Sequence, residues 1–317
     1  GQFKLWYSQA GTPEITLDGQ YDGATKTYQL QLSQNTKPTP GQDTKKPLHI
    51  PMLVALLGKD GADMKVVLAG QAASQHLLEL TSVSQSFIFE NVLEEPVLSV
   101  NRDFTAPVTV SMAQSDAQRA FLLAHDANSF SRWEAGQQYG CNLLLSMVED
   151  IQNGREAVPD DAFITAIGNV ITDDSLDAAY KALLLTLPSE EYIAEQMSVI
   201  DVDAIHKARE ILRRAIAAKY RDDFNGLYSA MTVNAPFAPD AAQAGKRALR
   251  NLALAYIAAG DAEKAANILL SHFEKANNMT DSAAALAELC QRDGAERETA
   301  LSAFHDRWIN NEQVMDK

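Results

Sequence analysis

The chain has few cysteines and no long hydrophobic run, and these two shortages exclude several classes of protein. Only Cys141 and Cys290 occur among 317 residues, so neither a disulfide-stapled scaffold nor a four-cysteine zinc site fits. The longest apolar run, near 50–57, is far shorter than the roughly 20 residues that cross a bilayer. No charged and then apolar leader opens the chain. We therefore expect a cytoplasmic protein with no membrane partner.

Positive charge is also scarce, which argues against a nucleic-acid partner. The chain carries 27 Lys and Arg against 42 Asp and Glu, for a net charge of −15. Binding to phosphates requires a Lys/Arg-rich surface that releases counterions, and no such excess is present. We interpret the acidic excess as a solvated surface. A hydrophobic content of 46% over this length is typical of a globular protein with two domains.

The first third of the chain has the pattern of β-strands. Residues 28–32 alternate apolar and polar side chains, which predicts one buried and one wet face. Seven or eight short strands in about 100 residues indicate a β-sandwich of immunoglobulin or fibronectin type. Residues 35–47 contain three prolines and are expected to form a loop or an edge. The other expected strands lie at 14–17, 49–57, 64–68, 77–80, 86–89, 97–101 and 108–112.

From Gln114 onward the apolar period becomes helical. Helix start signals occur at 159–161, 188–189 and 280–281, and Gly260 is a stop signal. Many helices with short links predict an all-α superhelix of HEAT or armadillo type, although no strict repeat period is present. The expected helices lie at 116–125, 130–152, 161 onward, 176–185, 190–197, 202–220, 222–231, 240–259, 262–276, 281–290 and 295–310.

The sequence contains none of the catalytic motifs considered below. None of the six histidines is followed by Glu or has a second His four residues away, as a zincin helix requires. A nucleophile elbow, Gly-x-Ser-x-Gly, and phosphate-binding glycine loops are absent from the sequence. Cys141 and Cys290 lie on apolar helix faces and are expected to be buried thiols, and Asp173, Asp174 and Asp177 are expected to start a helix. We therefore assign no catalytic, cofactor-binding or metal-binding residue.

Seven segments in order along the chain carry a family resemblance. They are WYSQAGTP (6–13), the run from Thr36 through KKPLHIP (45–51), FIFENV (87–92), FSRWEAGQ (130–137), LPS (187–189), ANNMTD (276–281) and VMDK (314–317). With these segments the chain resembles bacterial aminopeptidase N, a family of gluzincin-type zinc aminopeptidases that remove single residues from peptide N-termini.

The resemblance implies which part of such an enzyme this chain represents. Family members have a thermolysin-like catalytic domain, then a small β-sandwich, then a large helical domain. Residues 1–11 would be the tail of the missing catalytic domain, 12–112 the sandwich, and 113–317 the helical domain, truncated at its C-terminus. The zinc motif His-Glu-x-x-His and the exopeptidase motif Gly-x-Met-Glu-Asn of the family have no match in this sequence. No family site residue is therefore carried over.

Three functional hypotheses follow. The first is a non-catalytic fragment of a zinc-dependent aminopeptidase, a hydrolase of peptide catabolism, in which this part scaffolds and encloses the active-site chamber. Its expected partners are the catalytic domain of the same parent, which holds the zinc, and short peptides in the parent, with weak self-association of the fragment. The second is an independent protein-binding module built from a sandwich and a helical solenoid. The third is a standalone enzyme with scattered catalytic residues.

Overall fold

The structure, a computed structural model, describes residues 1–315, except for the side chains of residues 262–264. The last two residues of the predicted helical domain, 316–317, therefore lie outside the described part. The chain divides into two compact units, Gly1–Tyr139 and Gly140–Lys317. None of the helices in the described range combines the length and the apolar character needed to cross a membrane.

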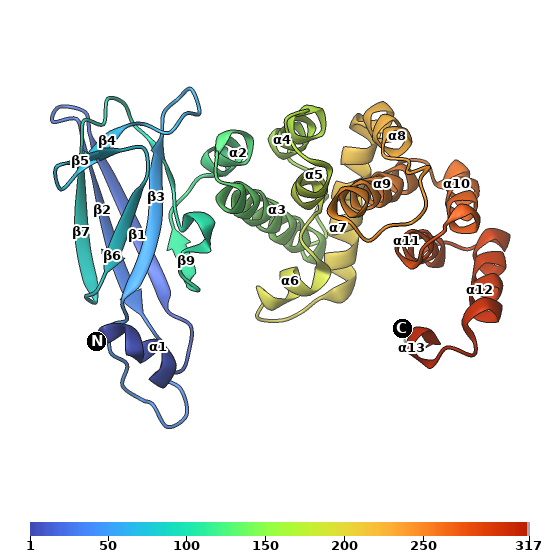
Figure 1. Cartoon of the computed structure of the whole chain (residues 1–317), viewed down its shortest axis with the longest axis horizontal. Helices are drawn as coiled ribbons and strands as arrows, with labels where there is room; N and C mark the ends of the chain where they lie inside the picture. Colours follow the sequence, from blue (N-terminus) through green and yellow to red (C-terminus); the bar gives the residue numbers. More distant parts are fainter. Residues whose placement is uncertain (316–317) are drawn as a thin grey trace. The chain divides into compact units, whose positions relative to one another are not determined.

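The first unit contains a sandwich of two β-sheets (Figure 1). One sheet has six strands in the order β5-β4-β7-β2-β1-β9, and the other has three in the order β6-β3-β8. β1 and β2 form an antiparallel hairpin, whereas β9 joins the free edge of β1 in parallel. The strands are β1 (Glu14–Asp22), β2 (Thr27–Asn35), β3 (Ile50–Leu57), β4 (Val66–Leu68), β5 (Gln71–Ala73), β6 (His76–Leu80), β7 (Ser84–Glu90), β8 (Val97–Ser99) and β9 (Thr109–Met112).

The sandwich core follows from the two-residue period of the strands. Tyr28, Leu30 and Leu32 of β2 are buried, while the side chains between them are exposed or half-buried. They pack in one cluster with Ile50 and Met52, which come from β3 in the facing sheet. Alternation along each strand therefore places the apolar side chains between the two sheets.

The second half of β3 is buried on both faces, unlike a strand with one wet side. Ala55 and Leu57 form a separate cluster with Leu122 and Ala135, which lie on the first helices after the sandwich. Burial on both faces favours the continuous apolar run of β3 over an alternating one. The helix at 116–125 and the part of the next helix up to Tyr139 therefore belong to the first compact unit.

Thirteen α-helices and two 3₁₀ turns are present in the described part of the chain (Figure 1). In the second unit, α9 contacts α5, α7, α8, α10 and α11, so it is the central helix of that unit. The helices and turns are η1 (Gln2–Lys4), α1 (Leu5–Ser8), η2 (Arg102–Phe104), α2 (Asp116–His125), α3 (Ser129–Gln152), α4 (Asp161–Thr172), α5 (Ala178–Leu185), α6 (Glu190–Glu195), α7 (Val202–Lys219), α8 (Arg221–Ala230), α9 (Ala241–Gly260), α10 (Ala262–Lys275), α11 (Met279–Cys290), α12 (Ala295–Trp308) and α13 (Glu312–Met315).

The structure confirms the predicted order of a β-sandwich followed by helices. Each expected strand and helix is present, with boundaries shifted by a few residues. Residues 36–49 form a loop, as the prolines predicted, with only an isolated bridge between Thr39 and Gln42. The short edge strand β5 was not predicted, because Gln71–Ala73 has no apolar alternation.

Two predicted helix starts are wrong by two residues. α5 was expected to begin at 176, but it begins at Ala178 after the N-cap Asp177. α11 was expected to begin at Thr280-Asp281, but it begins at Met279. The side chain of Asn278 is the N-cap, and it accepts a hydrogen bond from the backbone N–H of Asp281 at 3.0 Å. Asn is as good an N-cap as Asp, so composition alone did not distinguish the two positions.

Gly245 of α9 allows α5 to approach closely. A Cβ at this position would lie 3.0 Å from the backbone nitrogen of Ala179 and 3.2 Å from its Cβ. Gly226 of α8, in contrast, has open space around the position of a Cβ.

We expect Gly245→Val to lower the free energy of unfolding by about 1–3 kcal/mol, because the backbone of α5 must move. Gly226→Val is the matched control, and urea denaturation should show a change within about 0.5 kcal/mol. Equal effects of the two substitutions would contradict the close packing.

Candidate functional site: a buried arginine cluster and a polar cavity

The six histidines lie apart, each in its own structural setting. His76 is buried, with its Nε2 3.2 Å from the carbonyl oxygen of Val66, and the ring of His125 packs on that of Phe121. The remaining partners are Glu79 for His49, Glu190 for His206, Tyr228 for His272 and Asp306 for His305. Among the side chains of residues 1–261 and 265–315, no group of three His, Cys, Asp or Glu is placed to hold a metal ion.

The two cysteines differ from each other, and one prediction is wrong. Cys141 is buried as expected, and burial raises the pKa of its thiol. Cys290 is exposed, which contradicts the expectation of two buried thiols. Cys290 is the last residue of α11, whereas Leu289 beside it faces the core, so the apolar pattern of the helix did not extend to its end.

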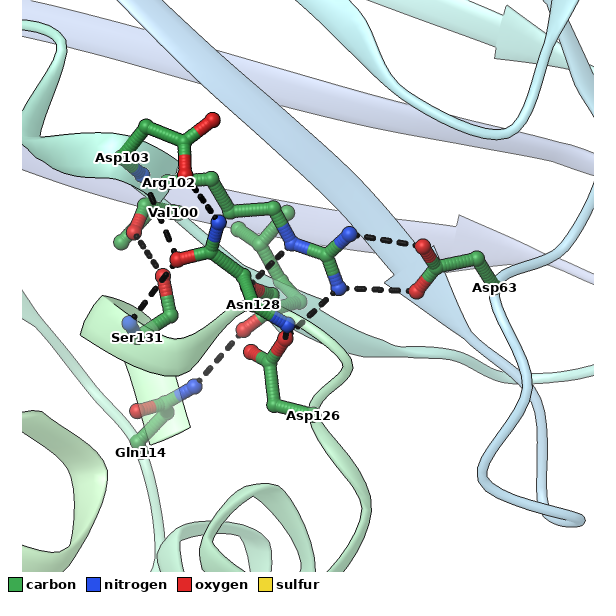
Figure 2. A network of polar contacts seen from close by, with 10 residues as sticks. Asp63, Val100, Arg102, Asp103, Gln114, Asp126, Asn128 and Ser131 are labelled. Carbon is green, nitrogen blue, oxygen red and sulfur yellow. Dashed lines mark hydrogen bonds and ion pairs between the residues drawn. The ribbon is translucent and has the colours of Figure 1, made fainter. Parts of the chain in front are cut away.

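The most densely connected polar group of the first unit is the guanidinium of Arg102, which has no exposed surface (Figure 2). Its two terminal nitrogens donate to both carboxylate oxygens of Asp63 at 2.6 and 2.8 Å. Nη2 also donates to Oδ1 of Asp126 at 2.8 Å, and Nε donates to the hydroxyl of Ser99 at 2.8 Å. Bidentate, charge-assisted contacts of this kind are the strong hydrogen bonds of proteins.

The backbone around Arg102 takes an unusual conformation that presents this side chain. Asn101, Asp103 and Phe104 have φ values of 50°, 57° and 51°, in the left-handed region that side chains disfavour. The amide of Asn101 holds the turn, because it donates to the carbonyl of Ala106 and accepts from the backbone N–H of the same residue, both at 3.1 Å. Local hydrogen bonds therefore stabilise a turn that sterics alone would not favour.

The same turn is tied to the start of α3. The side-chain nitrogen of Asn128 donates to the carboxylate of Asp103 at 2.6 Å, and the backbone N–H of Asp103 donates back to Asn128 at 3.2 Å. The hydroxyl of Ser131 donates to the carbonyl of Val100 at 3.2 Å (Figure 2). The sandwich and the first turn of α3 are therefore joined by polar contacts on both sides of Arg102.

One cation faces two carboxylates in this cluster. Burial raises the pKa of Asp126, although the hydrogen bond with Ser99 and the positive charge of Arg102 act in the opposite direction. A buried charge is tolerated only where paired charges and hydrogen bonds replace its water. The side chains of Arg102 and Asp126 have no exposed surface and that of Asp63 is 14% exposed, so these charges bind one another and connect the sandwich to the end of α2.

Sequence reasoning did not single out Arg102. One signal was available: Arg102 is the only arginine before Arg119 in the sequence. A lone arginine beside a strand of apolar residues is a candidate for a buried ion pair. Its partners could not have been named, because Asp63 lies 39 residues and Asp126 24 residues away.

A second polar group lines a cavity of about 440 Å³ among α8, α9, α10 and α11. The Tyr228 hydroxyl and Nδ1 of His272 are 3.0 Å apart, and the guanidinium carbon of Arg250 lies 4.6 Å from the centre of the Tyr228 ring. Asp281 accepts hydrogen bonds from the amides of Asn251 and Asn278, at 3.0 and 2.9 Å. Burial lowers the pKa of His272 to about 4, with the charge of Arg250 acting in the same direction and Asp281 opposing it. His272 is therefore neutral at pH 7.

Comparison with known proteins places both units in described families. Residues 116–317 match a domain of unknown function, DUF3458_C, described as ARM repeats, and residues 11–113 match DUF3458, described as an Ig-like fold. These descriptions confirm the predicted immunoglobulin-like sandwich and armadillo-like superhelix.

Among curated proteins, the chain is similar to Aminopeptidase N from three bacteria. It is 35% identical over 315 residues to the protein of Escherichia coli (strain K12). This alignment covers 99% of this chain and 36% of the relative. Identity is 34% to the protein of Haemophilus influenzae, over all of this chain and 36% of the relative. It is 38% to that of Caulobacter vibrioides, over 98% of this chain and 35% of the relative. The chain spans about a third of the length of these relatives.

A solved structure is similar over nearly the whole chain. The chain aligns with a crystal structure of Legionella pneumophila aminopeptidase A in complex with aspartic acid, with a TM-score of 0.80 and 27% identity. The alignment covers 98% of this chain and 35% of that protein. The similarity therefore extends over both units and agrees with the resemblance that the sequence segments indicated.

The Arg102 cluster predicts a large loss of stability when its cation is removed. We expect Arg102→Met to lower the free energy of unfolding by about 3–5 kcal/mol, because the two carboxylates lose their shared counter-charge. Arg214→Met is the control, since that side chain is 69% exposed and 3.8 Å from Glu210. Chemical denaturation should show a change within about 0.5 kcal/mol for this control. A loss for Arg102→Met no larger than that of the control would contradict the role of the cluster.

The pKa of His272 predicts a pH-dependent part of the stability. The unfolded chain protonates this residue near 6.5 and the folded chain only near 4, so the unfolded state binds more protons between these values. The stability due to neutral His272 is therefore complete above pH 6.5 and is lost as the pH falls toward 4. Between pH 7.5 and 5 the loss is about 2 kcal/mol.

His272→Gln provides the reference for this measurement, because it removes the titration and leaves the other groups in place. We expect the difference in unfolding free energy between the wild type and this variant to shrink by about 2 kcal/mol on acidification from pH 7.5 to 5. A difference that stays constant with pH would show that His272 titrates alike in both states.

Proposed function

The chain belongs to the DUF3458_C family of ARM-repeat domains, and from this membership we propose that it is the C-terminal, non-catalytic part of a zinc-dependent aminopeptidase. The observation that carries the proposal is the coverage of the relatives. Nearly all of this chain aligns with Aminopeptidase N of Escherichia coli, while the chain spans 36% of that protein. In this proposal the whole enzyme removes N-terminal residues from peptides, and this part scaffolds and encloses the chamber in which it does so.

We propose the following division of the chain within such an enzyme. Residues 1–11 end the catalytic domain, residues 12–112 are the sandwich domain, and residues 113–317 belong to the superhelical domain. The ranges matched by the two family descriptions, 11–113 and 116–317, support these boundaries. The same-chain partner of this part is then the catalytic domain, and short peptides are ligands of the whole enzyme. We place the enzyme in the cytoplasm.

The residues that the structure describes do not fit a zinc site. The six histidines have separate partners, and within the described residues none shares a metal-binding group with two other ligands. Zinc is therefore proposed for the catalytic domain, where it would polarise the scissile carbonyl and acidify a water. We derive no catalytic step for this chain, whose contribution is geometry and exclusion.

Exposed apolar side chains support an association with further protein. Val199 and Ile200, just before α7, are 77% and 58% exposed, and Val202 at its start is 68% exposed. A cluster of this kind is unusual on the surface of an isolated soluble domain and is typical of a contact surface. In the proposed enzyme such surfaces pack against other domains, and in the isolated chain they favour weak self-association.

An activity assay with the two parts made separately tests the proposal. We expect no turnover of alanyl or leucyl amides by this chain alone in the presence of zinc. Added to the catalytic part of Aminopeptidase N, the chain should bind saturably and raise turnover of short substrates relative to long, folded ones. The heat-unfolded chain is the control. Zinc-dependent turnover by the purified chain alone, abolished by a chelator, would contradict the proposal.

A further inference from the structure

We propose that the cavity among α8, α9, α10 and α11 is a binding site for a small molecule that carries an oxyanion, a carboxylate or a phosphate group, held by Arg250. This site is independent of the proposed aminopeptidase function and needs no second domain to be tested.

The cavity has the size and the mixed walls of a ligand site. Its volume of about 440 Å³ lies within the range of known small-molecule pockets, about 300–1,000 Å³. Val233 and Ile268 give apolar surface, and Arg250, Asn267 and Lys275 give polar groups. A ligand with one charged end and a carbon skeleton matches these walls better than a bare ion does.

Arg250 provides the charge of the site, and within the described part of the chain it has no carboxylate partner. Its Nε is buried without a hydrogen-bond acceptor. Arg213 of α7 differs from Arg250 in its carboxylate partners, because it forms ion pairs with Glu210 and Glu288, both at 2.9 Å. Because its guanidinium stacks on the ring of Tyr228, Arg250 is also held in one orientation, which reduces the entropy lost when a ligand binds.

The carboxylate that lines the cavity already has hydrogen bonds to neutral side chains. Asp281 lines the same cavity as Arg250 but accepts hydrogen bonds from the Asn251 and Asn278 amides, one on each carboxylate oxygen. Among the described side chains Arg250 therefore contacts Tyr228 but forms no ion pair with a carboxylate, while the negative charge of Asp281 is already hydrogen-bonded to amides. Lys275, exposed at the cavity wall, adds a second cation. This balance favours an anion over a cation as the ligand.

The third donor is His272, whose side chain is 4% exposed and whose Nε2 has no hydrogen-bond partner. The oxygen of Tyr228 faces the positive charge of Arg250, so its hydrogen is directed to Nδ1 of His272, 3.0 Å away. Nδ1 then accepts, and Nε2 carries the proton of the neutral ring. Arg250, Lys275 and the His272 ring are thus all donors, the type of group that carboxylates and phosphates require.

Isothermal titration calorimetry on the 317-residue chain tests the site with three probes: inorganic phosphate, succinate and, as a control anion, chloride. We expect saturable binding of phosphate, of succinate or of both, and none of chloride. Phosphate alone would identify a phosphorylated ligand, succinate alone a carboxylated one, and both together a site that recognises the oxyanion. Each of these three results supports the proposal.

Matched variants locate the binding in the cavity. Arg250→Gln should weaken the binding at least about tenfold, because a hydrogen bond to a charged group is lost. Arg214→Gln, on the exposed face of α7, should leave the binding unchanged. Lys275 is exposed, so we expect Lys275→Gln to preserve the fold. This variant replaces Arg250→Gln if the latter does not fold, and we expect it to weaken the affinity for the anion about threefold.

Nitrogen chemical shifts of His272 report the site directly. Addition of the anion that binds, phosphate or succinate, should shift the Nε2 resonance of His272 in the wild type and in Arg214→Gln. Two results would overturn the proposal: no saturation by phosphate or succinate at tens of millimolar, or binding by Arg250→Gln with unchanged affinity and fold.

Discussion

The arrangement of the first unit depends on the buried guanidinium of Arg102. Removing a full charge from water is unfavourable unless every donor finds an acceptor, and the acceptors come from two directions. Asp63 lies on the sandwich and Asp126 is the C-cap of α2, so the guanidinium keeps both carboxylates only when the sandwich and the end of α2 are in one relative position. The strained turn at residues 101–104 is the local consequence, because it places this side chain between its partners.

The second unit is organised around a different constraint, the close packing of α9 with its neighbours. Tyr256 stacks on Phe224 of α8 with ring centres 4.3 Å apart, and its hydroxyl donates to the carbonyl of Leu185 at the end of α5. Gly245 allows α5 to approach near the other end of the helix. Aromatic stacking and a missing side chain therefore set the spacing of three helices, while the largely buried ion pair between Arg213 and Glu288 links α7 to α11.

Much of the fold was accessible from the sequence, because apolar periods of two and 3.6 residues arise directly from strand and helix geometry. The expected strands and helices are present, and so is the loop around the prolines. The errors lie where local pattern is weak. β5 has no apolar alternation, Asn278 and Asp281 are equally good helix starts, and Cys290 sits at a helix end where the apolar face no longer faces the core.

By itself the sequence determined the element types, the order of sandwich and superhelix, the absence of known catalytic motifs and the family resemblance. These features depend on residues that are close together in the sequence and on short motifs. Only the tertiary structure decided which charges are paired. It brings Arg102 to two aspartates, and it places Arg250 and His272 beside a cavity while Asp281 is satisfied by amides. Coulombic and desolvation energies depend on distance and burial, which no local pattern encodes.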